Sequence, residues 1–313
     1  MSEQAIPAID VGGTLIKGGL VGPGGSIRNR ITRPTGTRDG HRSIVDRIAA
    51  VGRELAAAAA EATGRRPSAV GVAIPGLVDE ARGRAMLAAN FDWSDYPIAA
   101  ALADLIGTPV VLSHDVTVGA LAEYSLGAAA GARAAVVVPI GTGIAAGLVN
   151  RGQPYRGAHG RTLELGHLRV PWSDEPCGCG SVGCLERVAA ASSIARRYAE
   201  LTGQPVGGPA TPDAKEVGRR AQAGDRAAAQ VWHDAVRALA EGLVTVVTLL
   251  DPDRIVIAGG LSRAGESLLA PLRAELSDRL TFQVMPDVVE AALGQDAGLV
   301  GTAIAAGLVV TAG

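Results

Sequence analysis

Cysteine is scarce in this sequence, long apolar runs are missing, and neither sign of charge dominates. Only 3 of the 313 residues are Cys, all between positions 177 and 184, which excludes a framework of disulfides. The longest run of small apolar residues, 297–313, is too short to span a bilayer. The first residues lack the basic and apolar regions of a secretory signal. We therefore expect a cytoplasmic protein without a membrane partner.

The charge balance and the apolar content narrow the class of protein further. With 29 Lys and Arg against 31 Asp and Glu, no chain-wide surface for nucleic acid is expected. Apolar residues make up 48% of the chain and charged residues 19%, which excludes wholesale disorder. At about 100–200 residues per domain, the length predicts two domains with cores of their own.

The first third of the sequence predicts an α/β domain with a mixed sheet. An apolar segment at 5–11 and further expected strands at 15–21 and 26–33 are separated by tight Gly-rich turns, as in antiparallel hairpins. Residues 39–63 then carry apolar side chains at helical spacing. The uncharged run 69–74 is typical of a buried parallel strand, so hairpins and βα units are combined in one sheet.

A similar plan begins again near residue 134. A strand at 134–140, a Gly-Thr-Gly turn and a return strand at 144–149 repeat the N-terminal hairpin at an offset of 128 positions. Six of nine positions agree, which indicates duplication rather than two unrelated Gly-rich hairpins. We therefore expect two related domains that face each other across a cleft.

The two hairpin turns are candidates for phosphate binding. Glycine leaves peptide N–H groups unobstructed, and these donors with a Thr hydroxyl suit phosphate oxygens, although each turn alone is also typical of an ordinary hairpin. Asp10 ends the first strand, where a carboxylate can hold hydrated Mg²⁺, and Lys17 either adds positive charge or is merely solvated. The turn residues are Gly12, Gly13 and Thr14 in the first hairpin and Gly141, Thr142 and Gly143 in the second.

A third Gly-rich turn follows the strand expected at 254–258. Gly259 and Gly260 lie at its carboxyl end, where open α/β sheets bind ligands. They either let a nucleotide base or ribose approach the backbone or form a plain strand-to-helix turn.

The most specific local pattern combines His167 with Cys177, Cys179 and Cys184. Three thiolates and one imidazole make a closed tetrahedral set, which is typical of structural zinc. A redox-active pair, or three reduced thiols that never meet, are the alternatives. Bound zinc would fix the loop and its neighbours.

Polar residues near these features suggest a sugar site. Asn90 precedes an aromatic pair, Glu164 and Glu186 bracket the zinc loop, and His114 and Asp115 end a strand and begin a helix. A carboxylate at a strand end can accept a hydroxyl proton during phosphoryl transfer, so Asp115 is the candidate general base. Taken alone, Asp115 is more typical of a helix N-cap than of a catalytic base.

Together these residues resemble the ROK family of sugar kinases and repressors, within the actin-like sugar-kinase superfamily. The resemblance covers nearly the whole chain and implies two actin-like (RNase H-like) α/β domains with a cleft between them. The small domain would comprise 1–115 and the C-terminal helix 297–313, and the large domain 116–296 with the zinc loop. The motifs are Asp10-Val11-Gly12-Gly13-Thr14, Ile140-Gly141-Thr142-Gly143, Ile257-Ala258-Gly259-Gly260-Leu261, and Gly166-His167 with the zinc loop from Cys177 to Glu186.

The resemblance implies an ATP-dependent kinase that phosphorylates the 6-hydroxyl of a hexose. ATP, Mg²⁺ and structural Zn²⁺ would be bound, and a homodimer is expected. Asp115 would be the base at the reacting hydroxyl. The sugar would contact Gly76, Asn90, His114, Asp115, Glu164, His167 and Glu186, with His167 also on zinc.

Two departures from the family pattern concern the sugar pocket. His114 replaces an Asn that typically binds the sugar 3- and 4-hydroxyls, and Leu163 replaces the Gly before Glu164. A neutral imidazole can accept a hydrogen bond from an ammonium group, so the substrate expected is glucose or a glucose-like amino sugar such as kanosamine. The alternatives are a non-catalytic sugar-sensing or regulatory member, and a kinase for fructose, N-acetylmannosamine or allose.

Overall fold

The computed structural model describes residues 5–88, 91–207 and 211–312. Contacts divide the chain into two compact units. Unit 1 comprises Met1–Gly127, Gly152–Thr162 and Gln295–Gly313, and unit 2 comprises Ala128–Arg151 and Leu163–Gly294. The domain limits expected from the sequence remain a prediction.

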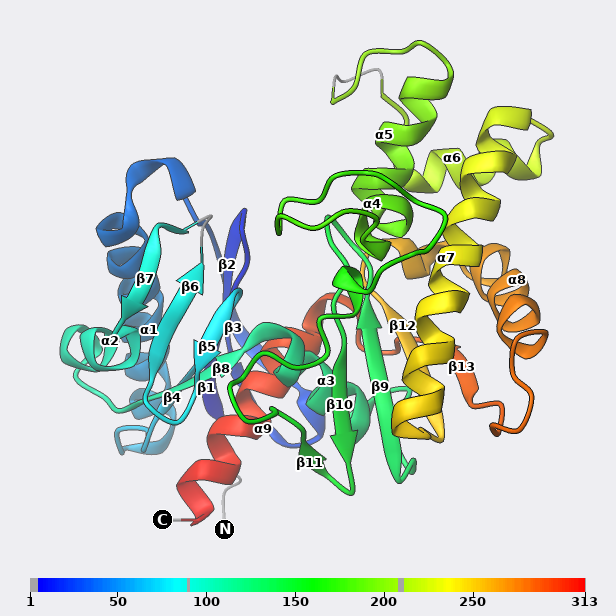
Figure 1. The fold of residues 1–313 in the computed structure, drawn as a ribbon. Helices are drawn as coiled ribbons and strands as arrows, with labels where there is room; N and C mark the ends of the chain where they lie inside the picture. Colours follow the sequence, from blue (N-terminus) through cyan, green and yellow to red (C-terminus); the bar gives the residue numbers. More distant parts are fainter. Residues whose placement is uncertain (1–4, 89–90, 208–210, 313) are drawn as a thin grey trace. The chain divides into compact units, whose positions relative to one another are not determined.

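A five-stranded mixed sheet forms the centre of unit 1 (Figure 1). Its order is β3-β2-β1-β4-β8, with antiparallel pairing from β1 to β3 and parallel pairing from β1 to β8. The mixed α/β sheet predicted from the sequence is confirmed. The strands are β1 (Ile6–Val11), β2 (Leu15–Val21), β3 (Ile27–Pro34), β4 (Val70–Ile74) and β8 (Val110–His114); a small antiparallel sheet contains β5 (Leu77–Asp79), β6 (Arg84–Ala88) and β7 (Trp93–Tyr96).

Side-chain size decides which helix packs on which face of this sheet. On β4, Val70, Val72 and Ile74 belong to the core cluster that includes α1. The intervening Gly71 faces α9, where an added Cβ would lie 2.8 Å from the backbone oxygen of Thr302. Because successive strand residues point to opposite faces, α1 and α9 cover opposite faces of the sheet. The helices of unit 1 are α1 (His41–Thr63), α2 (Ile98–Ile106), α3 (Asp115–Leu126) and α9 (Ala297–Ala312).

Unit 2 repeats this strand order. Its strands run in the order β10-β9-β12-β13, with β9 and β10 antiparallel and β12 and β13 parallel to β9. In both units, therefore, an antiparallel hairpin is followed by two parallel strands beside its first strand, as the duplicated hairpins predict. The strands are β9 (Ala134–Pro139), β10 (Gly147–Asn150), β12 (Arg254–Ala258) and β13 (Asp287–Glu290), and β11 (Gln153–Pro154) follows β10 along the chain.

Helices packed on the unit 2 sheet complete its core. The longest, α7, buries Trp232, Leu239 and Leu243 among the branched side chains of β9 and β12. Asp225 caps its N-terminus by accepting from the N–H of Ala228. The helices are α4 (Leu185–Ala189), α5 (Ala191–Leu201), α6 (Ala214–Gln222), α7 (Arg226–Leu250) and α8 (Glu266–Ser277).

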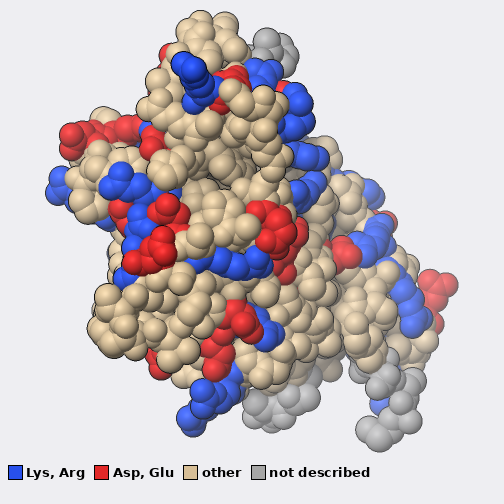
Figure 2. All heavy atoms as spheres, turned by 90° about the vertical axis from the view of Figure 1, so that its right-hand side faces the viewer, with Lys and Arg blue, Asp and Glu red and all other residues tan. Residues whose placement is uncertain are grey.

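The surface keeps the charge balance of the sequence. On the face drawn in Figure 2, Lys and Arg are interspersed with Asp and Glu rather than gathered by sign. Within residues 5–88, 91–207 and 211–312, no helix combines the length and apolar character needed to cross a membrane.

Two helices of unit 1 meet at a glycine. A Cβ added to Gly301 of α9 would lie 1.8 Å from the backbone oxygen of Val118 in α3. Side chains essentially never approach a carbonyl that closely, so only glycine permits this crossing. We predict that Gly301→Ala lowers the free energy of unfolding by about 1–3 kcal/mol or more, measured by chemical denaturation.

Gly307→Ala is the matched control on the same helix. Its added Cβ would meet only the flexible end of the Ile6 side chain, at 3.0 Å. The better helix propensity of alanine then offsets the contact. Equal stability losses in the two variants would contradict the close packing of α3 against α9.

Candidate functional site

The candidate residues of unit 1 gather where three parallel strands end. Because β1, β4 and β8 are parallel neighbours, their carboxyl ends lie at one edge of the sheet. Asp10 lies near the end of β1, and His114 and Asp115 lie at the junction of β8 with α3. Gly76 follows β4 with a φ of 95°, and an added Cβ would lie 2.4 Å from the oxygen of Leu87, so this position requires glycine. Asn90 lies outside the described residues.

Asp10 has an electrostatically unfavourable position. Burial raises the pKa of its carboxyl group from 3.8 to about 6, and the carboxylate of Asp115 adds to the rise. Lys17, directly opposite on β2, lowers this pKa. Gly298, in the first turn of α9, packs against Asp10, since a Cβ there would lie 2.4 Å from Oδ2. Two neighbouring carboxylates at a helix N-terminus fit a hard cation with oxygen ligands such as Mg²⁺.

Hydrogen bonds within the protein hold the first Gly-Thr turn in place. Gly12 donates its N–H to the oxygen of Leu15 at 2.9 Å and closes the hairpin. Thr35, which is fully buried, donates its hydroxyl to the oxygen of Gly12 at 2.7 Å and its N–H to the oxygen of Thr14 at 2.9 Å. An added Cβ on Gly13 would meet nothing within 4 Å, so this side of the turn is open to a ligand.

The imidazole of His114 lies next to the carboxylate of the candidate base, Asp115. Its Nε2 is 3.2 Å from Oδ1 of Asp115, and its Nδ1 is 3.4 Å from the hydroxyl of Thr117. The contact with the Thr117 hydroxyl holds the ring beside the Asp115 carboxylate. Both ring nitrogens are therefore engaged within the protein.

Glu80 supports this junction from the neighbouring small sheet. Its Oε1 accepts from the backbone N–H of His114 at 2.8 Å, and its Oε2 pairs with Arg156. Glu80 is only 14% exposed, and these two partners occupy its carboxylate oxygens. The contacts fix the backbone directly before Asp115.

The candidate residues of unit 2 also surround a Gly-Thr turn. Gly141 donates to the oxygen of Gly143 at 2.9 Å. Gly259 has a φ of 80°, and an added Cβ would lie 2.5 Å from the oxygen of Ile140, so the third Gly-rich turn packs against the hairpin. Gly260, by contrast, has open space at its Cβ position, as close approach of a ligand requires.

The acidic residues that bracket the zinc loop are placed differently. Glu186 lies in α4, and its Oε2 accepts from the N–H of Ile144 at 3.0 Å. Glu164 is exposed and accepts through its backbone oxygen from the N–H of His167. Leu163 just before it has a φ of 61°, a left-handed conformation that disfavours a branched side chain by about 1–2 kcal/mol. Glycine would adopt it freely.

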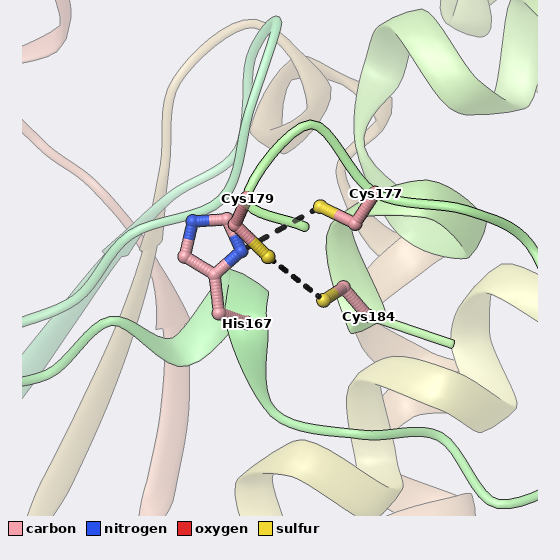
Figure 3. Close-up of side chains that lie close together, drawn as sticks. All are labelled: His167, Cys177, Cys179 and Cys184. Atoms are coloured by element: carbon pink, nitrogen blue, oxygen red, sulfur yellow. Dashed lines mark hydrogen bonds between the residues drawn. The ribbon is translucent and has the colours of Figure 1, made fainter. Parts of the chain in front are cut away.

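His167, Cys177, Cys179 and Cys184 point toward one another, as Figure 3 shows. One ligand atom from each lies within 4.8 Å of all the others. Nδ1 of His167 is 3.8 Å from Sγ of Cys177, and Sγ of Cys179 is 3.7 Å from Sγ of Cys184. A tetrahedral zinc ion with Zn–S bonds of about 2.3 Å separates its sulfurs by roughly 3.8 Å, so the set fits zinc closely.

The thiols need a cation in order to ionise together. Burial raises the pKa of Cys184 to about 12, and the neighbouring Cys177 and Cys179 add to the rise. A hydrogen bond from the backbone of Ser181 lowers the pKa of Cys179. Three crowded thiolates without a metal would repel one another, whereas a divalent ion neutralises them.

Several site residues carried no signal in the sequence. Hydrogen bonds or ion pairs hold the turns or the β8–α3 junction, and they come from Thr35, Glu80, Arg156 and Ser192. Each is a common polar residue without a motif around it. Only the folded chain brings them to the site.

Comparison with known proteins assigns the family. The model of the ROK family matches residues 6–307. The chain belongs to the ROK family. It is 34% identical to a glucokinase of Thermotoga maritima over 314 aligned residues, which cover 97% of each protein.

Solved structures agree with this assignment. A ROK hexokinase from Thermus thermophilus superposes with a TM-score of 0.83 at 33% identity, covering 98% of this chain and 99% of that one. A ROK glucokinase from Streptomyces griseus, solved with glucose and AMPPNP, gives 0.79 at 31% identity and covers 96% and 98%. This ROK protein is therefore a glucokinase-like sugar kinase, as the sequence motifs predicted.

Asp10 makes the stability of this ROK protein depend on pH. Its folded pKa of about 6 exceeds the usual 3.8, so only the folded protein keeps the proton between these values. The unfolded chain therefore binds fewer protons there, and stability falls as pH rises from about 4 to 6. We predict that Asp10→Asn stabilises the protein by about 3 kcal/mol at pH 8 and by about half of that at pH 5.

Thermal unfolding in Mg²⁺-free buffer at both pH values measures this difference. Asp46→Asn, which removes an exposed carboxylate from α1, is the control and should change little at either pH. A stabilisation by Asp10→Asn that is the same at pH 5 and pH 8 would contradict the raised pKa.

Proposed function

We propose that the protein transfers the γ-phosphoryl group of ATP to the 6-hydroxyl of a hexose, with glucose as the substrate. The observation that carries this proposal is the pair of Gly-Thr turns with open outer faces, combined with Asp115 at the end of a parallel strand. Its full-length similarity to glucokinases supports the same activity.

The turns would bind the phosphates of ATP. Peptide N–H groups near Gly13 and Gly141 offer fixed donors, which stabilise negative charge without reorganising during the reaction. Gly260 leaves space for the adenosine. Asp10 would hold Mg²⁺, which when bound neutralises phosphate charge.

Asp115 would act as the general base. The attacking oxygen of the sugar forms a bond to the γ-phosphorus while the bond from that phosphorus to the bridging oxygen of ADP breaks. The proton of the 6-hydroxyl passes to the Asp115 carboxylate. His114 at 3.2 Å and Glu80, through the backbone of His114, would keep that carboxylate oriented.

Unit 2 would supply the other sugar contacts through Glu164, His167 and Glu186, in keeping with the family pattern. A structural zinc ion on His167 and the three cysteines would hold the loop that carries them. The cytoplasmic location and the homodimer expected from the family stay predictions.

A glucose-like amino sugar such as kanosamine is the second candidate substrate. The observation that favours it is the His114–Asp115 pair, in which a partly exposed carboxylate would attract an ammonium group. Against it, both nitrogens of His114 already have partners in the protein. Glucose is therefore the first choice.

An assay of ADP release with Mg²⁺ and ATP tests the proposal. We expect wild-type protein to turn over with glucose, and Asp115→Asn to lower kcat by at least 100-fold, because the proton acceptor is lost. Glucose binding to Asp115→Asn, measured by calorimetry, should persist. Turnover by Asp115→Asn at the wild-type rate would refute its role as the base.

The same assay with kanosamine decides the role of His114. We expect His114→Asn to raise the ratio of kcat/KM for glucose to that for kanosamine, because an amide can bind two sugar hydroxyls whereas this imidazole is engaged by Asp115 and Thr117. Thr117→Val, which removes one imidazole partner, is the control for altered ring position. An unchanged ratio in His114→Asn would show that this residue does not select the sugar.

A further inference from the structure

The second Gly-Thr turn is tied to the segment that follows the zinc loop. Glu186, two residues after the zinc ligand Cys184, accepts from the N–H of Ile144 through Oε2 at 3.0 Å. An added Cβ on Gly143 would lie 2.4 Å from that same oxygen, so the turn is packed directly against the carboxylate. Only Oε2 is used in this bond, which leaves Oε1 for another donor.

The start of α5 holds the turn at two further points. The N–H of Ala191 donates to the oxygen of Gly141 at 2.9 Å, and the hydroxyl of Ser192 donates to the oxygen of Thr142 at 2.6 Å. Both carbonyl groups are thereby directed away from the phosphate side. Within the part of the chain that the structure describes, the N–H groups of Thr142 and Gly143 have no acceptor.

The turn that carries Glu164 and His167 packs against the carbonyl group of the same residue, Ile144. A Cβ on Gly166 would lie 2.3 Å from the oxygen of Ile144. Ile144 is buried, so its peptide cannot move without disturbing the residues on both sides. The phosphate turn and the sugar-binding residues therefore share one backbone segment.

We infer that Glu186 is a bridge that couples sugar binding to nucleotide binding, with Ser192 as a positioning residue for the phosphate turn. This inference rests on the proposed function. One carboxylate oxygen holds the turn through Ile144 while the other accepts from a sugar hydroxyl.

A bound sugar would fix the Glu186 rotamer in this bridging position. Without sugar, the half-buried side chain of Glu186 is free to leave the turn. Nucleotide binding must then order this side chain, and the entropy lost lowers the nucleotide affinity. Sugar and nucleotide therefore each raise the affinity for the other by the same factor. The charged acceptor makes the bond to Ile144 stronger than one between neutral groups.

Calorimetric titration with AMPPNP and Mg²⁺, with and without saturating glucose, measures this coupling. For the zinc-loaded wild-type protein we expect glucose to tighten AMPPNP binding by roughly tenfold. Glu186→Asp keeps the charge but is one methylene too short for both contacts, so the factor should fall close to one. Ser192→Ala should weaken AMPPNP binding and reduce the factor, while glucose alone binds as in the wild type.

Two further variants separate positioning from a general loss of structure. Ser192→Thr keeps the hydroxyl and should restore most of the coupling. Ser267→Ala removes a hydroxyl-to-carbonyl bond of the same kind, to Ala264 at 2.7 Å, elsewhere in unit 2 and should leave the coupling unchanged. Zinc content and unfolding temperature verify that each variant is folded. If Ser192→Ala does not fold, the coupling factor of Glu186→Asp alone tests the inference.

The outcomes separate this inference from the proposed function. Wild-type protein that phosphorylates glucose but binds AMPPNP equally well with and without it would overturn the bridge and leave the kinase proposal intact. Coupling that survives fully in both Glu186→Asp and Ser192→Ala would also overturn it. Failure to bind either glucose or kanosamine would refute both proposals together.

Discussion

A peptide turn can bind an anion only if its carbonyl oxygens are held elsewhere, because they would repel the phosphate. Both Gly-Thr turns of this protein meet that requirement at the carbonyl group of their Thr residue. Thr35 donates its N–H to the oxygen of Thr14, and Ser192 donates its hydroxyl to the oxygen of Thr142. Further donors hold the neighbouring carbonyl groups, from the Thr35 hydroxyl to Gly12 and from the N–H of Ala191 to Gly141. The phosphate-binding side of each turn thus stays open.

Two residues of the candidate site are held in energetically unfavourable states. Asp10 is held with a raised pKa beside a second carboxylate, and Leu163 adopts a conformation that suits glycine. Such costs persist only where the surrounding structure determines the geometry, as it does here through the tight packing of α3 against α9 and of Gly166 against Ile144. A bound cation would remove the electrostatic part of the cost, so ligand binding and stability are linked.

Much of the fold and of the chemistry could be predicted from local patterns. The β1–β2 hairpin, the repeat at β9 and β10, helix α1 and the clustered cysteines each depend on residues close together in the sequence, where spacing alone restricts the geometry. The ends of elements were less accurate: the return strand expected from residue 144 begins at Gly147, because Ile144 forms only an isolated bridge with Ile140 and bonds to Glu186 instead. A tertiary hydrogen bond replaced a ladder bond there, which no local pattern could indicate.

By itself, the sequence determined the mixed α/β architecture, the two Gly-Thr turns and the set of metal ligands, because hydrophobic period, glycine and clustered thiols restrict the chain locally. Tertiary structure alone decided which groups act on one another. It brought the imidazole of His114 to the carboxylate of Asp115, and the carboxylate of Glu80 to the backbone N–H of His114. It also brought Glu186 to the N–H of Ile144, 42 residues away in the chain. A single hydrogen bond across that separation leaves no periodicity or composition in the sequence, so its partners become known only when the chain is folded.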